Sequence, residues 1–116
     1  MRLYRKERIN DLLRDEISRT IMIDIKDPVL NSVTITAVKV SSDLGSAVVY
    51  FSKGVDNKDI QVIQDGLSRS AGFIRFIIKK NLCMRRIPVL KFKYDDSIEY
   101  GMRIEGLLAG LTRNEK

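Results

Sequence analysis

The residues best suited to chemistry in this chain are the cations between Arg69 and Lys93. Eight basic side chains fall in this stretch, with no Asp or Glu among them: Arg69, Arg75, Lys79, Lys80, Arg85, Arg86, Lys91 and Lys93. The whole chain carries only +6, so the other 91 residues sum to −2. A basic excess confined to one stretch is typical of surfaces that bind polyanions, most often nucleic acid.

The sequence offers little support for catalysis. It contains no histidine, the commonest general base and metal ligand. Ser-His-Asp and Cys-His nucleophile arrangements and Cys/His zinc sites are therefore excluded. Asp11, Asp15 and Glu16 are better explained as a solvated helix face, with Asp15 one turn before Arg19, than as paired catalytic carboxylates. We expect no catalytic residue, no metal and no cofactor.

Length and composition favour one small globular domain. The 116 residues suit a single core, and 44% of them are hydrophobic. No apolar run approaches the roughly 20 residues that span a bilayer, and the first residues do not resemble a signal peptide. Cys83 is the only cysteine, which fits a cytoplasmic protein. We expect one domain over residues 1–116, with a frayed tail at 112–116, and nothing requires more than a monomer.

The first half of the chain predicts a helix and a β-hairpin. Apolar residues recur at helical spacing over residues 3–23, and Asp27-Pro28 ends that pattern. A connecting loop over 25–32 leads to strands at 33–40 and 46–52, joined by a turn. The apolar alternation shifts phase in the first strand, which predicts a bulge at Ala37–Val38.

A second helical stretch carries much of the basic segment. Asp56 or Asn57 is suited to cap it, and Ser70-Ala71-Gly72 interrupts it. Glycine in a helix costs about 1 kcal/mol relative to alanine, so Gly72 indicates a kink or a close backbone approach. Over residues 72–82 the apolar residues predict one buried face: Phe73, Ile74, Ile77, Ile78 and Leu82.

Phe76 projects into the opposite, basic face of this helix, among Arg75, Lys79 and Lys80. One explanation is an aromatic platform for a base or ribose, flanked by cations. The other, commoner for aromatic residues at helix edges, is packing against a neighbouring element. The sequence leaves both explanations open.

The last strand of the pattern follows Pro88. Leu90, Phe92 and Tyr94 alternate with Lys91 and Lys93, which predicts one buried face and one wet, cationic face. A weak helix is expected over residues 100–111. Three strands with helices on one face make an α+β, two-layer domain. Its sheet is either mixed or has the third strand beside the first.

The order helix-strand-strand-helix-kink-helix-strand suggests a KH-type RNA-binding module. Ordinary KH domains place a Gly-x-x-Gly loop between two helices, where it clamps the nucleic-acid backbone. No such motif occurs here between the helices, and Gly72 alone lies at the junction. A general single-stranded RNA-binding module is therefore an alternative that this missing loop disfavours.

The sequence resembles the bacterial ribosome-binding factor A family from about Arg5 to Leu111. Asp27-Pro28, the turn Ser42-Asp43-Leu44 and the segment 72–75 match that family in order. The most specific matches lie in the last third of the chain: Arg86, Pro88, Leu90, Phe92, Asp95, Ser97, Gly101, Arg103 and Ile104.

The resemblance implies a type II KH fold with a three-stranded mixed sheet, in which an Ala-x-Gly kink replaces the Gly-x-x-Gly loop. Here that kink reads Ser70-Ala71-Gly72. The resemblance also implies binding to the small (30S) ribosomal subunit late in its assembly, a role in 16S ribosomal RNA maturation, and growth at low temperature. The expected RNA-binding residues are the eight cations together with Gly72 and Phe76.

Overall fold

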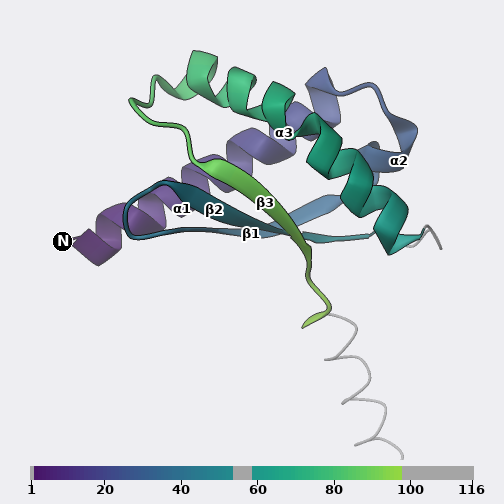
Figure 1. Cartoon of the computed structure of the whole chain (residues 1–116), viewed down its shortest axis with the longest axis horizontal. Helices are drawn as coiled ribbons and strands as arrows, with labels where there is room; N and C mark the ends of the chain where they lie inside the picture. Colours follow the sequence, from purple (N-terminus) through teal and green to yellow (C-terminus); the bar gives the residue numbers. More distant parts are fainter. Residues whose placement is uncertain (1, 54–58, 98–116) are drawn as a thin grey trace, which may run out of the picture.

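The computed structural model describes residues 2–53 and 59–97, which form helices, a π-helical turn (η1) and three strands (Figure 1). In chain order they are α1 (Arg2–Arg19), η1 (Thr20–Asp24), α2 (Pro28–Asn31), β1 (Thr34–Val40), β2 (Ser46–Ser52), α3 (Ile60–Leu82) and β3 (Val89–Tyr94). The expected weak helix at 100–111 and the tail at 112–116 lie outside the described residues.

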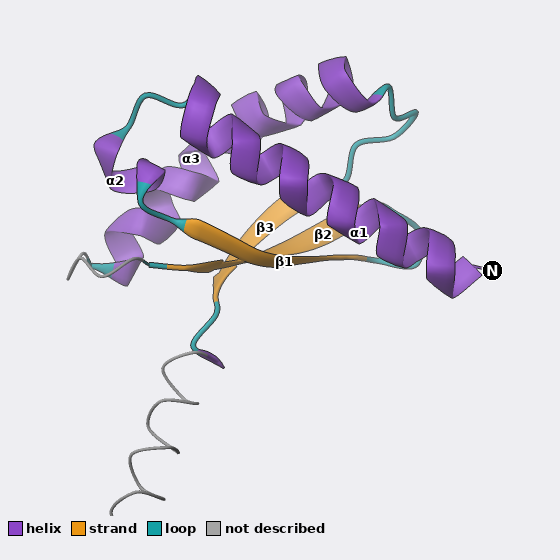
Figure 2. Ribbon diagram, turned by 180° about the vertical axis from the view of Figure 1, so that it is seen from behind, coloured by secondary structure: helices purple, strands orange, loops and turns teal. Residues whose placement is uncertain are grey.

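The three strands form a mixed sheet in the order β1-β2-β3. β1 and β2 are antiparallel, whereas β2 and β3 are parallel, so the third strand lies beside the second and not the first. Figures 1 and 2 show α1 and α3 on the same side of this sheet. The α+β prediction, with helices on one face of a mixed sheet, is confirmed.

The bulge in β1 lies one residue earlier than predicted. The register shifts between Ile35 and Ala37, so Thr36 is the extra residue. Its hydroxyl donates to a carboxylate oxygen of Asp95 at 2.7 Å, beyond the end of β3. This cross-sheet bond gives Thr36 a partner outside the ladder, and Val38 returns to the buried face.

α1 packs on the sheet through side chains one turn apart. Leu13 and Ile17 of α1 are almost fully buried, and Ile21 of η1 continues the same buried face. The side chain of Asn10 accepts a hydrogen bond from the backbone N–H of Val40 at 2.9 Å, which ties the helix to the end of β1. The predicted helix over 3–23 is therefore confirmed, although its last turn widens into η1.

The carboxylates of α1 have different partners from those expected. Arg19 pairs with Glu16 at 2.7 Å and with Asp24 at 3.7 Å, not with Asp15. Asn81 of α3 also donates to Glu16 at 2.6 Å. Glu16 thus serves as a structural link between α1 and α3.

The segment expected to be a plain loop, 25–32, contains the short helix α2. The side chain of Asp27 accepts a hydrogen bond from the N–H of Val29, and Pro28 occupies the first helical turn. Leu30 of α2 is buried against Gly66 of α3, whose position would place a Cβ only 3.1 Å from a Leu30 methyl carbon. The close backbone approach within this fold is therefore at Gly66, not at Gly72.

The predicted helix-kink-helix is one continuous helix, α3, whose ribbon changes direction as it crosses the sheet (Figure 1). Asp59 caps it by accepting from the N–H of Gln61; the expected caps, Asp56 and Asn57, lie outside the described residues. Ile74 and Ile78 are fully buried as predicted, but Phe73 is 44% exposed.

Candidate nucleic-acid interface

A groove of about 560 Å³ runs between α3, the connector 83–88 and the β1–β2 turn. Its lining includes four cations, two glycines and an exposed aromatic ring, and we call it the basic groove. It is lined by Gly45, Gly72, Arg75, Phe76, Lys79, Arg85, Arg86, Ile87 and Val89. Six of the ten residues predicted to bind RNA meet here: Gly72, Arg75, Phe76, Lys79, Arg85 and Arg86.

The connector is held in place by Arg75. Its guanidinium donates from Nε to the carbonyl of Pro88 at 3.1 Å and from a terminal nitrogen to that of Ile87 at 3.0 Å. The N–H of Val89 in turn donates to the carbonyl of Gly45 at 3.0 Å. Arg75 was expected to contact phosphate. In the structure its guanidinium holds the connector that carries Arg85 and Arg86.

The β1–β2 turn forms the opposite wall. The carboxylate of Asp43 accepts from the hydroxyl of Ser41 at 2.7 Å and from the N–H of Gly45 at 2.9 Å. These bonds, the Ser41 hydroxyl first, lower the pKa of Asp43, and the nearby charge of Arg86 lowers it further. Asp43 is thus a negative charge beside the basic groove. From the sequence, this residue was expected only to form the turn.

Phe76 lies on the outward face of α3 and is 63% exposed. It does not bury its ring against a neighbouring element, as the commoner explanation required. Its ring lines the basic groove together with Lys79 one turn later. The geometry therefore leaves the ring accessible to a ligand in the groove.

Gly72 also lines the basic groove, and an added Cβ there would meet no heavy atom within 4 Å. Its φ angle is not positive, so neither strain nor internal packing requires glycine at this position. The helix nevertheless bears the propensity cost of a glycine. No contact among the described residues explains why position 72 has glycine and not a residue with a side chain.

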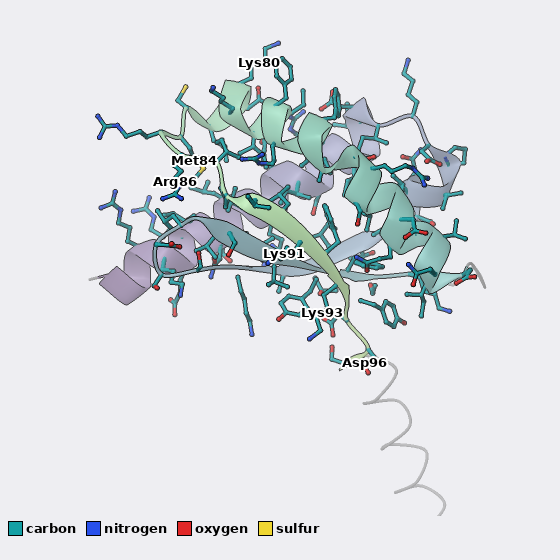
Figure 3. All side chains as sticks on the ribbon, in the orientation of Figure 1. Lys80, Met84, Arg86, Lys91, Lys93 and Asp96 are labelled. Atoms are coloured by element: carbon teal, nitrogen blue, oxygen red, sulfur yellow. The ribbon has the colours of Figure 1, made fainter. Side chains whose placement is uncertain are left out.

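Arg69 and Lys80 are exposed on α3 but do not line the groove. Lys80 projects away from the sheet at the end of α3 (Figure 3). Lys79 and Lys80 also occupy the last turn of that helix, where cations interact favourably with its negative end. These two lysines thus have a structural effect in addition to any contact with a ligand.

The remaining predicted residues, Lys91 and Lys93, lie on a different surface. Leu90 and Phe92 of β3 are buried beneath the helices, so the alternating lysines point to the opposite face of the sheet. The cations predicted to bind RNA therefore do not all line one groove.

A second, more apolar groove of about 450 Å³ adjoins the basic groove and shares Arg85 and Arg86 with it. Ile9, Leu12, Leu44, Leu82 and Met84 supply its apolar lining, and Arg5 and Asp43 complete it. The placement of Arg5 connects the basic amino-terminal turn with the connector. The sequence alone carried no signal for this contact.

Among residues 2–53 and 59–97, no group of three or more Asp, Glu, Cys or His side chains is arranged to hold a metal ion. No helix in this part of the chain combines the length and apolar character needed to cross a membrane.

The family model for ribosome-binding factor A matches residues 5–108. The chain belongs to the ribosome-binding factor A family. A ribosome-binding factor A from Desulfitobacterium hafniense (strain DSM 10664 / DCB-2) is 41% identical over 116 residues, covering 100% of this chain and 93% of that protein. One from Macrococcus caseolyticus (strain JCSC5402) is 40% identical over 111 residues, covering 96% and 97%.

A solved structure supports the same assignment. The crystal structure of ribosome-binding factor A from Thermus thermophilus matches with a TM-score of 0.70 and 25% identity, covering 77% of this chain and 94% of that one. The ribosome-binding factor A family thus accounts for the mixed sheet and the long helix α3, and the type II KH-like fold expected from the resemblance is confirmed.

Proposed function

We propose that this protein is a non-enzymatic assembly factor that binds the small (30S) ribosomal subunit and assists late maturation of 16S ribosomal RNA. Membership of the ribosome-binding factor A family carries this proposal. A homology model of the Thermus thermophilus ribosome-binding factor A, with a similar fold, has been fitted into a cryo-EM map of a complex of that protein with the 30S subunit. The protein would act in the cytoplasm, as a monomer with one KH-like domain.

The basic groove supplies the docking surface in this proposal. Arg85, Arg86 and Lys79 would neutralise phosphates and release their counterions, which makes binding strongly dependent on salt. Phe76 would stack on an exposed base or ribose, and Gly72 would admit the RNA backbone close to α3. Arg69 and Lys80 extend the cationic surface along the helix.

The proposed action breaks no covalent bond. A factor that binds one conformation of the RNA more tightly than others shifts the population toward it until the subunit is complete. The sequence has no histidine, the commonest general base in catalysis, which fits a role that breaks no bond.

A general single-stranded RNA-binding role is the alternative, and the exposure of Phe76 between cations is the observation that favours it. Sedimentation with purified small subunits, large subunits and bare RNA across a salt series separates the two. Selective migration with small subunits that weakens as salt rises supports the assembly factor. Equal binding to all three would support the general RNA-binding role instead.

A further inference from the structure

The face of the sheet that the described helices leave uncovered carries a cluster of cations around an aromatic ring. Lys91 and Lys93 project from β3, and Lys39 projects from β1; all three are exposed. Tyr50 lies between them on β2. Figure 3 shows Lys91 and Lys93 on β3, apart from Lys80 and Arg86. We call this surface the open sheet face.

Strand register places these side chains in two adjacent rows. Lys39 pairs with Val48, which pairs with Lys91, so the two lysines lie two strand spacings apart, about 10 Å. Tyr50 pairs with Lys93 in the next row, about 7 Å along the strand. The ammonium of Lys39 lies 5.6 Å from the centre of the Tyr50 ring.

The acidic groups near this face lie at one end. Asp95 and Asp96 follow β3, and the carboxylate of Asp95 is already engaged by Thr36 and by the N–H of Ser97. Asp95 lies near enough to Lys39 for their charges to interact, but no described acidic group pairs with the three lysines within 4.0 Å. Three exposed cations on a face that the sheet makes rigid complement a polyanion.

We propose that the open sheet face binds the phosphate backbone of a second RNA segment while the basic groove holds the first. The inference rests on the RNA-binding role proposed above and adds a consequence to it. Leu90 and Phe92 point toward the helices, so Lys91 and Lys93 lie on the other face of the edge strand β3. An RNA backbone held in the basic groove would have to turn around this edge near Val89, which lines the groove, to reach both lysines. The protein would instead hold one RNA segment in the groove and another on the open sheet face.

The test counts RNA molecules on one protein chain. A hairpin RNA of about 20 base pairs is immobilised on beads, and a fluorescent copy of the same RNA is offered with the full-length protein. We expect the wild-type protein to capture the fluorescent copy, and sedimentation equilibrium in excess RNA to give two RNAs per protein chain. One RNA per chain, or two RNAs held only by a protein dimer, would overturn the inference.

A triple variant, Lys39→Gln/Lys91→Gln/Lys93→Gln, assigns the second site. It should bind one RNA, with capture of the fluorescent copy reduced roughly tenfold or more and a shallower salt dependence. The matched control Arg8→Gln/Arg14→Gln/Lys26→Gln removes the same charge elsewhere and should capture the copy normally. Unchanged capture of the fluorescent RNA by the sheet variant would refute the proposal. If the sheet variant instead bound poly-glutamate more weakly than wild type but captured RNA normally, the open sheet face would bind an acidic protein and the proposal would also fail.

The variant Arg85→Glu/Arg86→Glu keeps this result separate from the proposed function. If it no longer sediments with small subunits while the sheet variant still captures two RNAs, the assembly-factor proposal stands and the second RNA site fails. If the wild-type protein binds neither subunits nor RNA, both proposals fail.

Discussion

The guanidinium of Arg75 bridges α3 to the carbonyls of Ile87 and Pro88, at 3.0 and 3.1 Å. A helix residue therefore sets the path of the connector that carries Arg85 and Arg86. The planar fork of arginine reaches two acceptors at once, whereas the single ammonium of lysine cannot reproduce its geometry. Arg75 contributes to the basic groove by positioning other cations as well as through its own charge.

Arg75→Lys is accordingly expected to lower the free energy of unfolding by about 1 kcal/mol, through loss of one carbonyl hydrogen bond. Binding to small subunits should also weaken, although the charge is retained. Urea denaturation and sedimentation measure the two effects. Lys79→Arg, which also keeps the charge, is the control and should leave stability unchanged; if both variants behave like wild type, Arg75 does not position the connector.

Gly72 and Gly66 on the same helix should respond differently to substitution by alanine. A Cβ at position 72 meets open space, so Gly72→Ala should stabilise the fold by about 1 kcal/mol through helix propensity. A Cβ at position 66 would lie 3.1 Å from a Leu30 methyl, so Gly66→Ala should gain less or lose stability. Thermal melting compares the two variants.

The stabilised Gly72→Ala protein should nevertheless bind small subunits more weakly, because its methyl group occupies the basic groove. A β-branched substitution such as Gly72→Val should weaken binding further. Full binding by both variants would show that the bare backbone of Gly72 is not needed for docking.

Arg85→Glu/Arg86→Glu should abolish sedimentation with small subunits while leaving the fold intact, since both side chains are exposed. Circular dichroism confirms the fold, and the salt series measures the loss of binding. Arg14→Glu/Lys26→Glu makes the same change in net charge outside the basic groove and should still bind. Similar losses in both variants would indicate a general charge effect and not a site.

Glu16 should make stability depend on acid pH. Its hydrogen bond with Arg19, helped by Asn81, lowers the pKa of its carboxyl from the ordinary value of 4.5. A carboxylate with a depressed folded pKa contributes stability above its unfolded pKa and loses it as pH falls through the folded pKa. Glu16→Gln should therefore destabilise at neutral pH, with the difference from wild type shrinking below about pH 4.5.

Urea denaturation at a series of pH values measures this difference. Glu7→Gln, at an exposed position on the same helix, is the control, and its free energy of unfolding should differ from that of wild type by the same amount at every pH. If Glu16→Gln lowered the free energy of unfolding by the same amount at every pH, the carboxylate charge would not be what links α1 to α3.

Cys83 ends α3 with φ of 51° and ψ of 35°, the left-handed conformation that glycine adopts without strain. Cys83→Gly should raise the free energy of unfolding by up to about 1 kcal/mol. Leu44 also has a positive φ, of 60°, but it packs against the core, so Leu44→Gly should destabilise. A lower melting temperature for Cys83→Gly than for wild type would show that the left-handed conformation of Cys83 does not cost stability.

The spacing of apolar residues along the chain was sufficient to predict most of the fold. Helical spacing located α1, and alternation located the strands, because burial of one face imposes these periods directly on the sequence. The short α2 was missed because one turn is too short to show a period. The bulge was misplaced by one residue because its position depends on the bond between Thr36 and Asp95, which are 59 residues apart.

The sequence by itself determined which residues carry charge and that Lys91 and Lys93 face away from Leu90 and Phe92. Only the tertiary structure decided which cations lie together. Packing of α3 against the sheet buried one side of β3 and left the β3 lysines outside the basic groove. Packing also brought Gly45 and the connector to Gly72, since contacts between distant segments depend on how the layers assemble and leave no local period in the chain.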